Sequence, residues 1–201
     1  MSDSIAAFLE TVTAEFTQVI DTMDIPALMK AADLISASQA DGARVHLTGI
    51  GKPGYVAKYL SSLLSSTGTP AYFLDGTEAV HGSSGQVCPG DVVIAISNSG
   101  ETQELKATVS TLLANKAHVI ACTRSESSWL AAQAEVTLVA GVAQEGDDLN
   151  KPPRASILAE TVVLQALSIE LQKRHALNKQ DYVKWHPGGS LGASIRQEEK
   201  Q

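Results

Sequence analysis

Four short apolar segments recur along the chain with helical stretches between them, and this alternation limits the folds that the chain can adopt. The segments are "RVHLTG", "DVVIAIS", "AHVIACT" and "EVTLVAG". Each is rich in β-branched residues and almost continuously apolar, which is typical of strands buried on both faces of a sheet. Helices between such strands predict right-handed crossovers and a mostly parallel sheet. The chain is therefore expected to adopt an α/β fold.

The full pattern predicts a three-layer α/β/α sandwich with a five-stranded, mostly parallel sheet and an N-terminal pair of helices. Apolar residues at helical spacing predict two helices within residues 3–39, with a break near Asp24-Ile25-Pro26. No linker or repeat divides the 201 residues, so we expect one domain, with helices in residues 1–40 and a core in residues 41–196. The expected strands are residues 44–49, 71–74, 91–96, 117–122 and 135–139, and the further helices are 53–66, 101–115, 127–133 and 155–175.

The composition excludes several classes of partner. A net charge of −7 argues against nucleic acid, which is bound by clustered Lys and Arg. No apolar run approaches the roughly 20 residues of a membrane span, and the acidic N-terminus does not resemble a signal peptide. Cys88 and Cys122 lie in unrelated contexts, so we expect two reduced thiols in a cytoplasmic protein with no membrane partner.

The stretch "GIGKPG" at residues 49–54 matches the G-x-G-x-x-G fingerprint of dinucleotide-binding folds. Asp75 lies 21 positions beyond Gly54, close to where such folds carry a ribose-binding acid. Pro53, however, lacks the backbone N–H that a phosphate-facing turn would use. The spacing thus favours a dinucleotide, whereas the proline argues against one.

The loop expected after the third strand, "SNSGET" at residues 97–102, concentrates hydroxyl groups at the start of a helix. Backbone N–H groups at a helix N-terminus are unpaired, and the helix dipole favours an anion there. The carboxyl ends of strands in open parallel sheets are also where ligands bind. An ordinary N-cap needs only one hydroxyl. The larger set predicts a cradle for a phosphate monoester and consists of Ser97, Asn98, Ser99 and Thr102.

The segment "AISNSGET" at residues 95–102 resembles the phosphosugar-binding loop of the sugar isomerase (SIS) domain, a Rossmann-like and flavodoxin-like fold. The resemblance extends to "GIGKPG", "STGTP", "EAVHG" and "WHPGGSLG" and covers about residues 40–196. Within the family, these patterns are similar to those of D-arabinose 5-phosphate isomerases, which supply Kdo biosynthesis. The resemblance implies an isomerase that interconverts D-ribulose 5-phosphate and D-arabinose 5-phosphate through an enediol. It also implies that the glycines of "GIGKPG" lie beside a sugar and that Asp75 is a turn residue.

The resemblance further implies roles for individual residues. An enediol mechanism needs a group that moves a proton between C1 and C2 and a cation beside the developing oxyanion. Lys52 would be that cation, His186 would open the sugar ring or relay a proton in a site shared between subunits, and either Glu101 or Glu145 would be the base. The implied substrate-binding residues are Gly51, His81, Ser97, Asn98, Ser99 and Thr102.

Purely structural explanations exist for the same residues. His81 is equally well explained as a helix-terminal histidine bonded to a carbonyl, Glu101 as a helix N-terminal acid and Glu145 as a surface acid. His46 and His118 are expected in buried strands, and His175 at a helix end, without catalytic roles. We expect no cofactor and no metal, because enediol chemistry of this type requires none and no clustered acid or H-x-x-x-H pattern occurs.

Two segments depart from the family pattern and leave the identity of the sugar open. The family usually has a small hydroxyl residue where Pro53 stands, and a run rich in Ser and Thr where "PRASI" stands at residues 153–157. Only Ser156 keeps a hydroxyl there, and Arg154, Asp147 and Asp148 are expected to reshape the pocket. The alternatives are an isomerase of another ketose phosphate and a non-catalytic phosphosugar sensor, as SIS domains are in some transcription regulators.

The resemblance also bears on assembly. The two N-terminal helices have more apolar surface than one sheet needs, so a homo-oligomer is expected, with a tetramer favoured over a dimer. Arabinose 5-phosphate isomerases usually continue into a pair of CBS domains, and none is expected in a chain that stops at Gln201.

Overall fold

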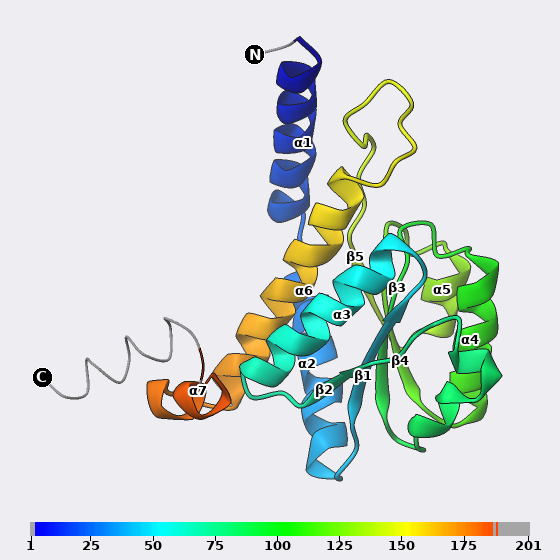
Figure 1. The fold of residues 1–201 in the computed structure, drawn as a ribbon, viewed down its shortest axis with the longest axis vertical. Coiled ribbons are helices and arrows are strands. Elements are labelled where there is room, and N and C mark those ends of the chain that lie inside the picture. The colour runs from blue at the N-terminus through cyan, green and yellow to red at the C-terminus, as the bar shows by residue number, and fades with distance from the viewer. Residues whose placement is uncertain (1–2, 187, 189–201) are drawn as a thin grey trace, which may run out of the picture.

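A five-stranded sheet forms the centre of the computed structural model, which describes residues 3–186 and 188 (Figure 1). The strands pair in the order β2-β1-β3-β4-β5, and every pair is parallel. The prediction of a mostly parallel sheet is confirmed, and the bounds of the strands differ by at most one residue from those expected. The strands are β1 (Val45–Gly49), β2 (Ala71–Phe73), β3 (Val92–Ile96), β4 (His118–Thr123) and β5 (Val136–Val139).

Helices cover both faces of this sheet, as the predicted three-layer architecture requires. The apolar core on one face includes residues of α2 (Ile25–Ala40), α3 (Lys52–Ser66) and α6 (Ala155–Arg174). The core on the other face is formed with α4 (Gln103–Ala114) and α5 (Trp129–Gln133). The two layers of helices lie on opposite sides of the strands in Figure 1.

Strand β3 shows why its sequence is continuously apolar. Ile94 and Ile96 belong to the core that contains α2, α3 and α6, whereas Val93 and Ala95 point to the opposite face. All four side chains are fully buried. Because successive residues of a strand alternate between faces, a strand covered on both sides needs an apolar residue at every position.

The predicted break between the N-terminal helices is confirmed. Helix α1 (Asp3–Asp21) is separated by residues 22–24 from Ile25, where α2 begins. Asp24 is the N-cap of α2, and its side chain accepts a hydrogen bond of 2.9 Å from the Ala27 N–H. Pro26 lies in the first turn, where a missing N–H costs nothing. Figure 1 shows α1 projecting away from the sheet, beside the start of α6.

Some short elements were not expected from the sequence. Helix α7 (Lys179–Trp185) has no buried residue, so no apolar stripe marks it, and its start depends on the Asn178 side chain, which accepts a 2.9 Å bond from Asp181 N–H. Two 3-10 turns, η1 (Ala79–His81) and η2 (Ser83–Gln86), follow β2.

Helix α6 is the one helix of the described residues that is long and apolar enough, by length and composition, to cross a membrane. Half of its most apolar window is buried within the fold, where Val163, Leu167 and Leu171 join the core with α2 and α3. It is therefore a core helix of this fold.

The strand order reverses between β1 and β3. The chain passes from β1 to β2 on one side, and β3 then pairs with the other edge of β1. In open parallel sheets such a reversal leaves a crevice at the carboxyl ends of the two diverging strands, and ligands bind there. The loops at residues 50–51 and 97–102 leave the sheet at this point.

The opposite end of the sheet contains a buried pair, His46 and Asp91. The Nε2 atom of His46 lies 3.1 Å from Asp91 Oδ2, and Asp91 also accepts bonds of 2.8 Å from the backbone N–H groups of Arg44 and Cys88. Burial lowers the pKa of His46, and the hydrogen bond to Asp91 offsets part of that effect. His118, which the sequence placed in a buried strand, instead has a side chain that is 39% exposed and lies 2.5 Å from Glu135.

We predict that Asp91→Ala lowers the free energy of unfolding by about 3 kcal/mol, because it leaves two backbone N–H groups and the buried His46 without their acceptor. Asp41→Ala, at an exposed aspartate at the end of α2, is the control and should change the free energy by less than about 0.5 kcal/mol. Urea unfolding followed by circular dichroism measures both. Equal free energies for the two variants would contradict a structural role for Asp91.

Candidate functional site

The loop at residues 97–102 is held in shape by its own hydroxyl groups. Ser97 Oγ accepts a 3.1 Å bond from the Gly100 N–H and lies 3.5 Å from Thr102 Oγ1. Ser99 Oγ accepts a 3.2 Å bond from the Glu101 N–H. Ser97 is buried and Ser99 is exposed, so the loop runs from the core to the surface at the carboxyl end of β3.

The N-terminus of α4 is not capped by a side chain. Thr102 occupies the N-cap position with extended backbone angles, yet its hydroxyl accepts no bond from the first N–H groups of the helix. No other side chain of the described residues accepts one either. The alternative that these hydroxyls serve an ordinary cap therefore has no support here, and the first turn of α4 keeps the donors that an anion would use.

The glycines of "GIGKPG" let the end of β1 approach the start of α3 closely. A Cβ atom on Gly49 would lie 2.9 Å from the carbonyl carbon of Pro53, and one on Gly54 would lie 2.7 Å from the Gly49 oxygen. A side chain at either position would force the strand and the helix apart. These two glycines are thus required by the close packing of the strand end against the helix start.

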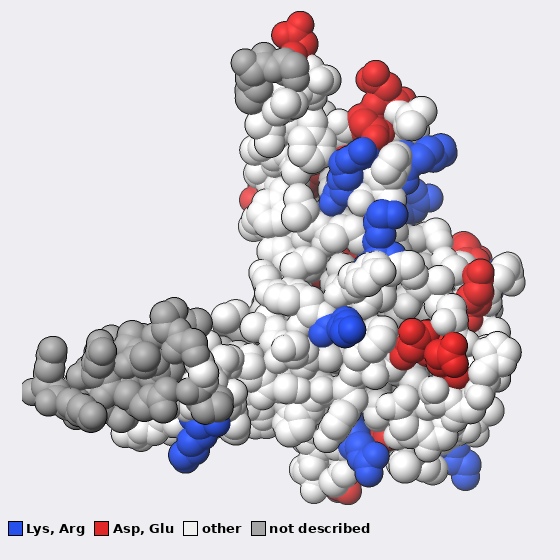
Figure 2. Space-filling view, in the orientation of Figure 1, with Lys and Arg blue, Asp and Glu red and all other residues white. Residues whose placement is uncertain are grey.

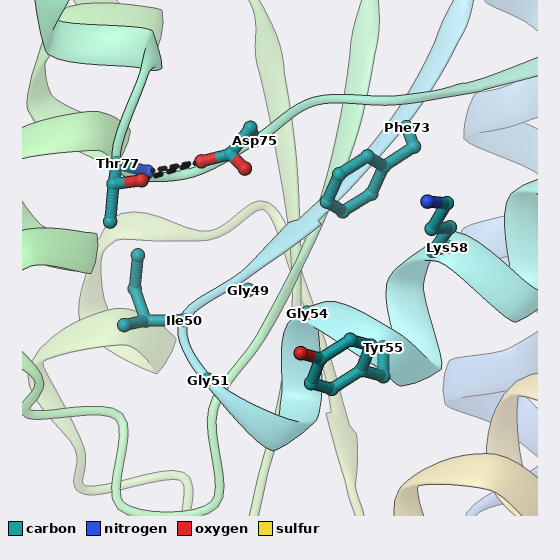
Figure 3. A pocket seen from close by; sticks show the side chains of 9 residues that line it. All are labelled: Gly49, Ile50, Gly51, Gly54, Tyr55, Lys58, Phe73, Asp75 and Thr77. Atoms are coloured by element: carbon teal, nitrogen blue, oxygen red, sulfur yellow. Dashed lines mark hydrogen bonds between the residues drawn. The ribbon is translucent and has the colours of Figure 1, made fainter.

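A pocket of about 270 Å³ opens beside this turn (Figure 3). Tyr55 and Lys58 line it from α3 and Phe73 from β2. Asp75 lies at its other side, and its Oδ1 atom accepts bonds from the backbone and hydroxyl of Thr77, at 2.9 and 2.7 Å, and from the Glu78 N–H. These bonds lower the pKa of Asp75, with the Thr77 hydroxyl contributing most. The expectation that Asp75 is a turn residue is confirmed.

Lys52 begins α3 and is exposed. It lines a second hollow of about 380 Å³. The other walls come from Tyr55 and Tyr59 of α3, from Pro153 directly before α6 and from Ile157 in its first turn. Figure 2 shows blue Lys and Arg surfaces gathered where Figure 1 places the starts of α3 and α6, although the chain as a whole is acidic. A local positive field at this end of the sheet would attract an anionic ligand.

Glu101 is tied to two neighbouring helices. Its Oε2 atom lies 2.6 Å from Lys106 Nζ of α4, and its Oε1 atom accepts a 2.7 Å bond from the Trp129 N–H at the start of α5. The carboxylate is exposed, and these contacts lower its pKa, with Lys106 as the largest cause. Both oxygens are thus occupied in joining α4 to α5.

Glu145 is buried beside the start of α6. Its Oε2 atom accepts bonds from the N–H groups of Arg154 and Ser156, at 2.6 and 3.1 Å. A carboxylate is favoured at this position by the helix dipole. No group in the described part of the chain bonds Oε1, so one oxygen of Glu145 is left for another partner. The alternative of a surface acid is therefore wrong for Glu145, whose side chain is in the interior.

The loop around Glu145 is closed by side-chain bonds. The Glu145 N–H donates a 2.6 Å bond to Asn150 Oδ1, and Asn150 N–H donates a 2.8 Å bond to Asp147 Oδ1. The Arg154 guanidinium pairs with Asp147 across the same loop. Arg154 thus forms an ion pair at the loop surface, and its effect on the pocket stays a prediction.

Glu160 is a buried carboxyl that the sequence did not predict. It lies on α6, is fully buried, and neither carboxyl oxygen has a hydrogen-bond partner. Burial, and secondarily the charge of Glu145, raise the pKa of Glu160 to about 8. The Ser156 hydroxyl, one turn earlier on the helix, is also buried without a partner. No sequence signal marks Glu160, because an acid in a helix is usually solvated.

The two candidate histidines occupy different ends of the sheet. His81 is exposed at the end of the turn that follows β2, on the side of the carboxyl ends. His186 follows α7, where it stacks on Tyr182 at 4.0 Å between ring centroids. Trp185 beside it lines a hollow with Pro70 and Ala71, at the start of β2. Within one chain the structure therefore does not bring His186 to Glu145; the rest of its motif lies largely outside the described residues.

Within residues 3–186 and 188, no group of three or more His, Cys, Asp or Glu side chains is arranged to hold a metal ion. The residues that the structure gathers at the carboxyl ends of the strands are Lys52, His81, the 97–102 loop and Glu145.

Comparison with known proteins identifies the family to which these features point. The sequence model of the SIS domain family matches residues 39–170 of this chain. The chain is 37% identical over 166 residues to the arabinose 5-phosphate isomerase KdsD of Francisella tularensis. The alignment covers 83% of this chain and 51% of the relative. KdsD of Pseudomonas aeruginosa is 38% identical over 167 residues, and that alignment covers 83% of this chain and 50% of the relative. The chain thus spans about half the length of these curated relatives.

A solved structure agrees with this similarity. The Escherichia coli CFT073 protein c3406 in complex with arabinose 5-phosphate superposes with a TM-score of 0.82 at 35% identity, covering 93% of this chain and all of that chain. The fold inferred from the strand pattern is therefore the fold of that protein.

We predict that Glu160→Gln stabilises the fold by an amount that depends on pH. The folded pKa of about 8 lies above the ordinary 4.5, so between these values the folded chain holds a proton that the unfolded chain has released. The stability of the wild type therefore falls as the pH rises through this window. The advantage of the variant should grow from near zero at pH 4.5 to, at most, roughly 5 kcal/mol at pH 8, as 1.36 kcal/mol per pKa unit implies.

Urea unfolding at pH 5, 6.5 and 8 measures this difference. Glu170→Gln, on the same helix at a carboxylate 2.8 Å from Arg174, is the control and should give no stabilisation that grows with pH. A stabilisation by Glu160→Gln that stays constant with pH would contradict the assignment.

Proposed function

The chain belongs to the SIS domain family, and on that basis we propose that it is an aldose–ketose isomerase that interconverts D-ribulose 5-phosphate and D-arabinose 5-phosphate. The similarity to arabinose 5-phosphate isomerases, and to a protein solved with arabinose 5-phosphate, supports this substrate. The observation that carries the proposal is the combination, at one end of the sheet, of an uncapped helix N-terminus and a buried glutamate with one free carboxylate oxygen.

The loop at residues 97–102 would bind the phosphate of the substrate. The first N–H groups of α4 and the hydroxyls of Ser97, Ser99 and Thr102 are donors for phosphate oxygens. Asn98 would extend this set through the N–H donors of its side-chain amide. A phosphate held here would orient the sugar toward the loops that follow β1 and β5, which contain Gly51, Lys52 and Glu145.

Glu145 is the better candidate for the base. In the direction from ketose to aldose, the base removes a proton from C1 to give the 1,2-enediol and returns a proton to C2, so no oxidant or reductant is consumed. Glu145 Oε1 has no partner among the described residues, whereas both oxygens of Glu101 are bonded to Lys106 and Trp129. The bonds to Glu145 Oε2 would orient the carboxylate without blocking the second oxygen.

Lys52 would stabilise the negative charge that develops on the carbonyl oxygen as the enediol forms. His81 would bond a sugar hydroxyl from the turn after β2. His186 would act on the sugar of a neighbouring subunit, because the two ends of the sheet separate it from Glu145 of its own chain. The proposed active site is therefore shared within a homo-oligomer, for which a tetramer is favoured.

We predict that Glu145→Gln lowers kcat by about 10² to 10⁴-fold, since a glutamine cannot accept the proton. Glu101→Gln should lower kcat by less than tenfold, because its carboxylate is occupied in helix contacts. The assay converts ribulose 5-phosphate, with the product identified by NMR. Larger loss in Glu101→Gln than in Glu145→Gln would reverse the assignment of the base.

The same assay separates the alternatives. If the wild type binds ribulose 5-phosphate, as a rise in melting temperature would reveal, but forms no product, the chain is a sensor or acts on a different sugar. A panel of hexulose and heptulose phosphates distinguishes these two outcomes.

We predict that two inactive variants complement each other in a mixed oligomer. Glu145→Gln and His186→Ala each disable one half of a shared site, so an oligomer that contains both chains has some sites with neither change. Unfolding and refolding of an equal mixture should restore about a quarter of the wild-type activity for a dimeric arrangement, as an order-of-magnitude estimate of random assortment. A mixture that stays as inactive as its components would contradict the shared site.

A further inference from the structure

Helix α1 contacts the loop that contains Glu145 through a buried glutamate. The side chain of Glu15 is in the interior, with a relative exposure of 8%. Its Oε2 atom accepts a 2.9 Å bond from the Ala143 N–H, and its Oε1 atom accepts a 2.9 Å bond from the Gln144 N–H. One carboxylate therefore holds two consecutive backbone N–H groups that lie 128 and 129 residues away in the sequence.

These two bonds fix the chain directly before Glu145. Hydrogen bonds to an ionised acceptor are about twice as strong as neutral ones, and partial burial of the carboxylate makes their loss costly. The loop that they hold has no regular secondary structure between β5 and α6. The conformation of this loop depends on hydrogen bonds made by side chains. The bonds of Asn150 and Asp147 lie within the loop, whereas those of Glu15 come from α1.

Helix α1 also contacts the residue directly after Glu145. A Cβ atom on Gly146 would lie 2.7 Å from Phe8 Cδ2 and 3.3 Å from Val12 Cγ2, and Gly146 has a φ of +95°. Phe8, Val12 and Glu15 are spaced at about one turn along α1 and share one face. The helix thus packs against the loop on both sides of Glu145, in agreement with the neighbouring positions of α1 and the loop in Figure 1.

We infer that Glu15 is a positioning residue for Glu145 and that α1 is part of the support of the active site. This inference rests on the proposed function, in which Glu145 moves the proton. Glu15 touches no reacting atom, and it acts through the backbone at residues 143–146. Helix α1 lies before the matched region of the SIS domain, residues 39–170, so the support comes from outside that region.

The alternative is that Glu15 only stabilises the fold. The two roles differ in what they change, because a stabilising residue affects the melting temperature and a positioning residue affects the geometry of the base. An error of about 1 Å in the position of a catalytic group costs about 10²-fold in rate. The phosphate loop at residues 97–102 does not contact α1 through any bond of the described residues, so substrate affinity should be preserved.

The test compares Glu15→Gln with Glu10→Gln in the full chain. The amide introduced by Glu15→Gln would keep one acceptor oxygen but would turn an N–H toward a backbone N–H. Glu10 is exposed on the same helix and makes no hydrogen bond to the loop. We expect Glu15→Gln to lower kcat by about 10 to 100-fold with KM changed by less than about threefold. Glu10→Gln should have wild-type kinetics.

A second readout does not depend on turnover. Amide hydrogen exchange should become at least about tenfold faster in a peptide that covers residues 141–150 of Glu15→Gln, with residues 97–102 unchanged. Gly146→Ala, which collides with Phe8, is expected to lower kcat in the same way. The double variant should lose less than the product of the two single effects, because both act on one loop.

The outcomes separate this inference from the proposed function. An active wild type, an inactive Glu145→Gln and a Glu15→Gln with full kcat would overturn the positioning role alone. The positioning role is also overturned if Glu15→Gln only lowers the melting temperature while kcat and the exchange at residues 141–150 stay unchanged. A wild type without turnover, or a fully active Glu145→Gln, would overturn the proposed function and the positioning role together, and the exchange data would still report whether Glu15 holds the loop.

Discussion

Strand β3 is paired along both edges and covered on both faces, and the other elements are arranged around it. Its backbone groups need β1 and β4 as partners, because buried N–H and C=O groups must be hydrogen-bonded. Its side chains need helices on both sides, since Ile94 and Ala95 point in opposite directions and are both buried. The connection from β1 to β2 then leaves β1 and β3 as the point of reversal. The candidate site follows from this arrangement, because the loops after these two strands leave the sheet at one place.

Three helix N-termini near this place have the same positive end of a helix dipole but different partners. The start of α4 has no side-chain cap among the described residues, so its first N–H groups are unpaired. The start of α6 is bonded by one oxygen of Glu145, and the second oxygen has no partner among the described residues. The start of α5 is bonded by Glu101, whose other oxygen is paired with Lys106. The positive end of a helix favours an anion in each case, and the number of free donors and acceptors decides what that anion can do.

The structure buries two glutamates outside the loops of the site, and their surroundings are opposite. Glu15 has a hydrogen-bond donor for each oxygen, and through these bonds it holds the backbone before Glu145. Glu160 has no donor for either oxygen, so burial raises its pKa to about 8 and it is mostly protonated at neutral pH. A buried carboxyl without partners is costly once ionised. The two carboxyl groups are both buried and differ in whether they have hydrogen-bond donors as partners.

The sequence by itself determined the layers, the strands to within one residue, the break before α2 and the hydroxyl-rich loop that precedes α4, because apolar periodicity and local capping are properties of neighbouring residues. The resemblance to the SIS family also implied that Asp75 is a turn residue. Only the tertiary structure decided that Glu101 is occupied by Lys106 and Trp129, that Glu145 is buried with one free oxygen, and that Glu15 and Glu160 are interior. These facts depend on contacts between residues up to 129 positions apart, and no local pattern encodes which N–H group a distant carboxylate will meet.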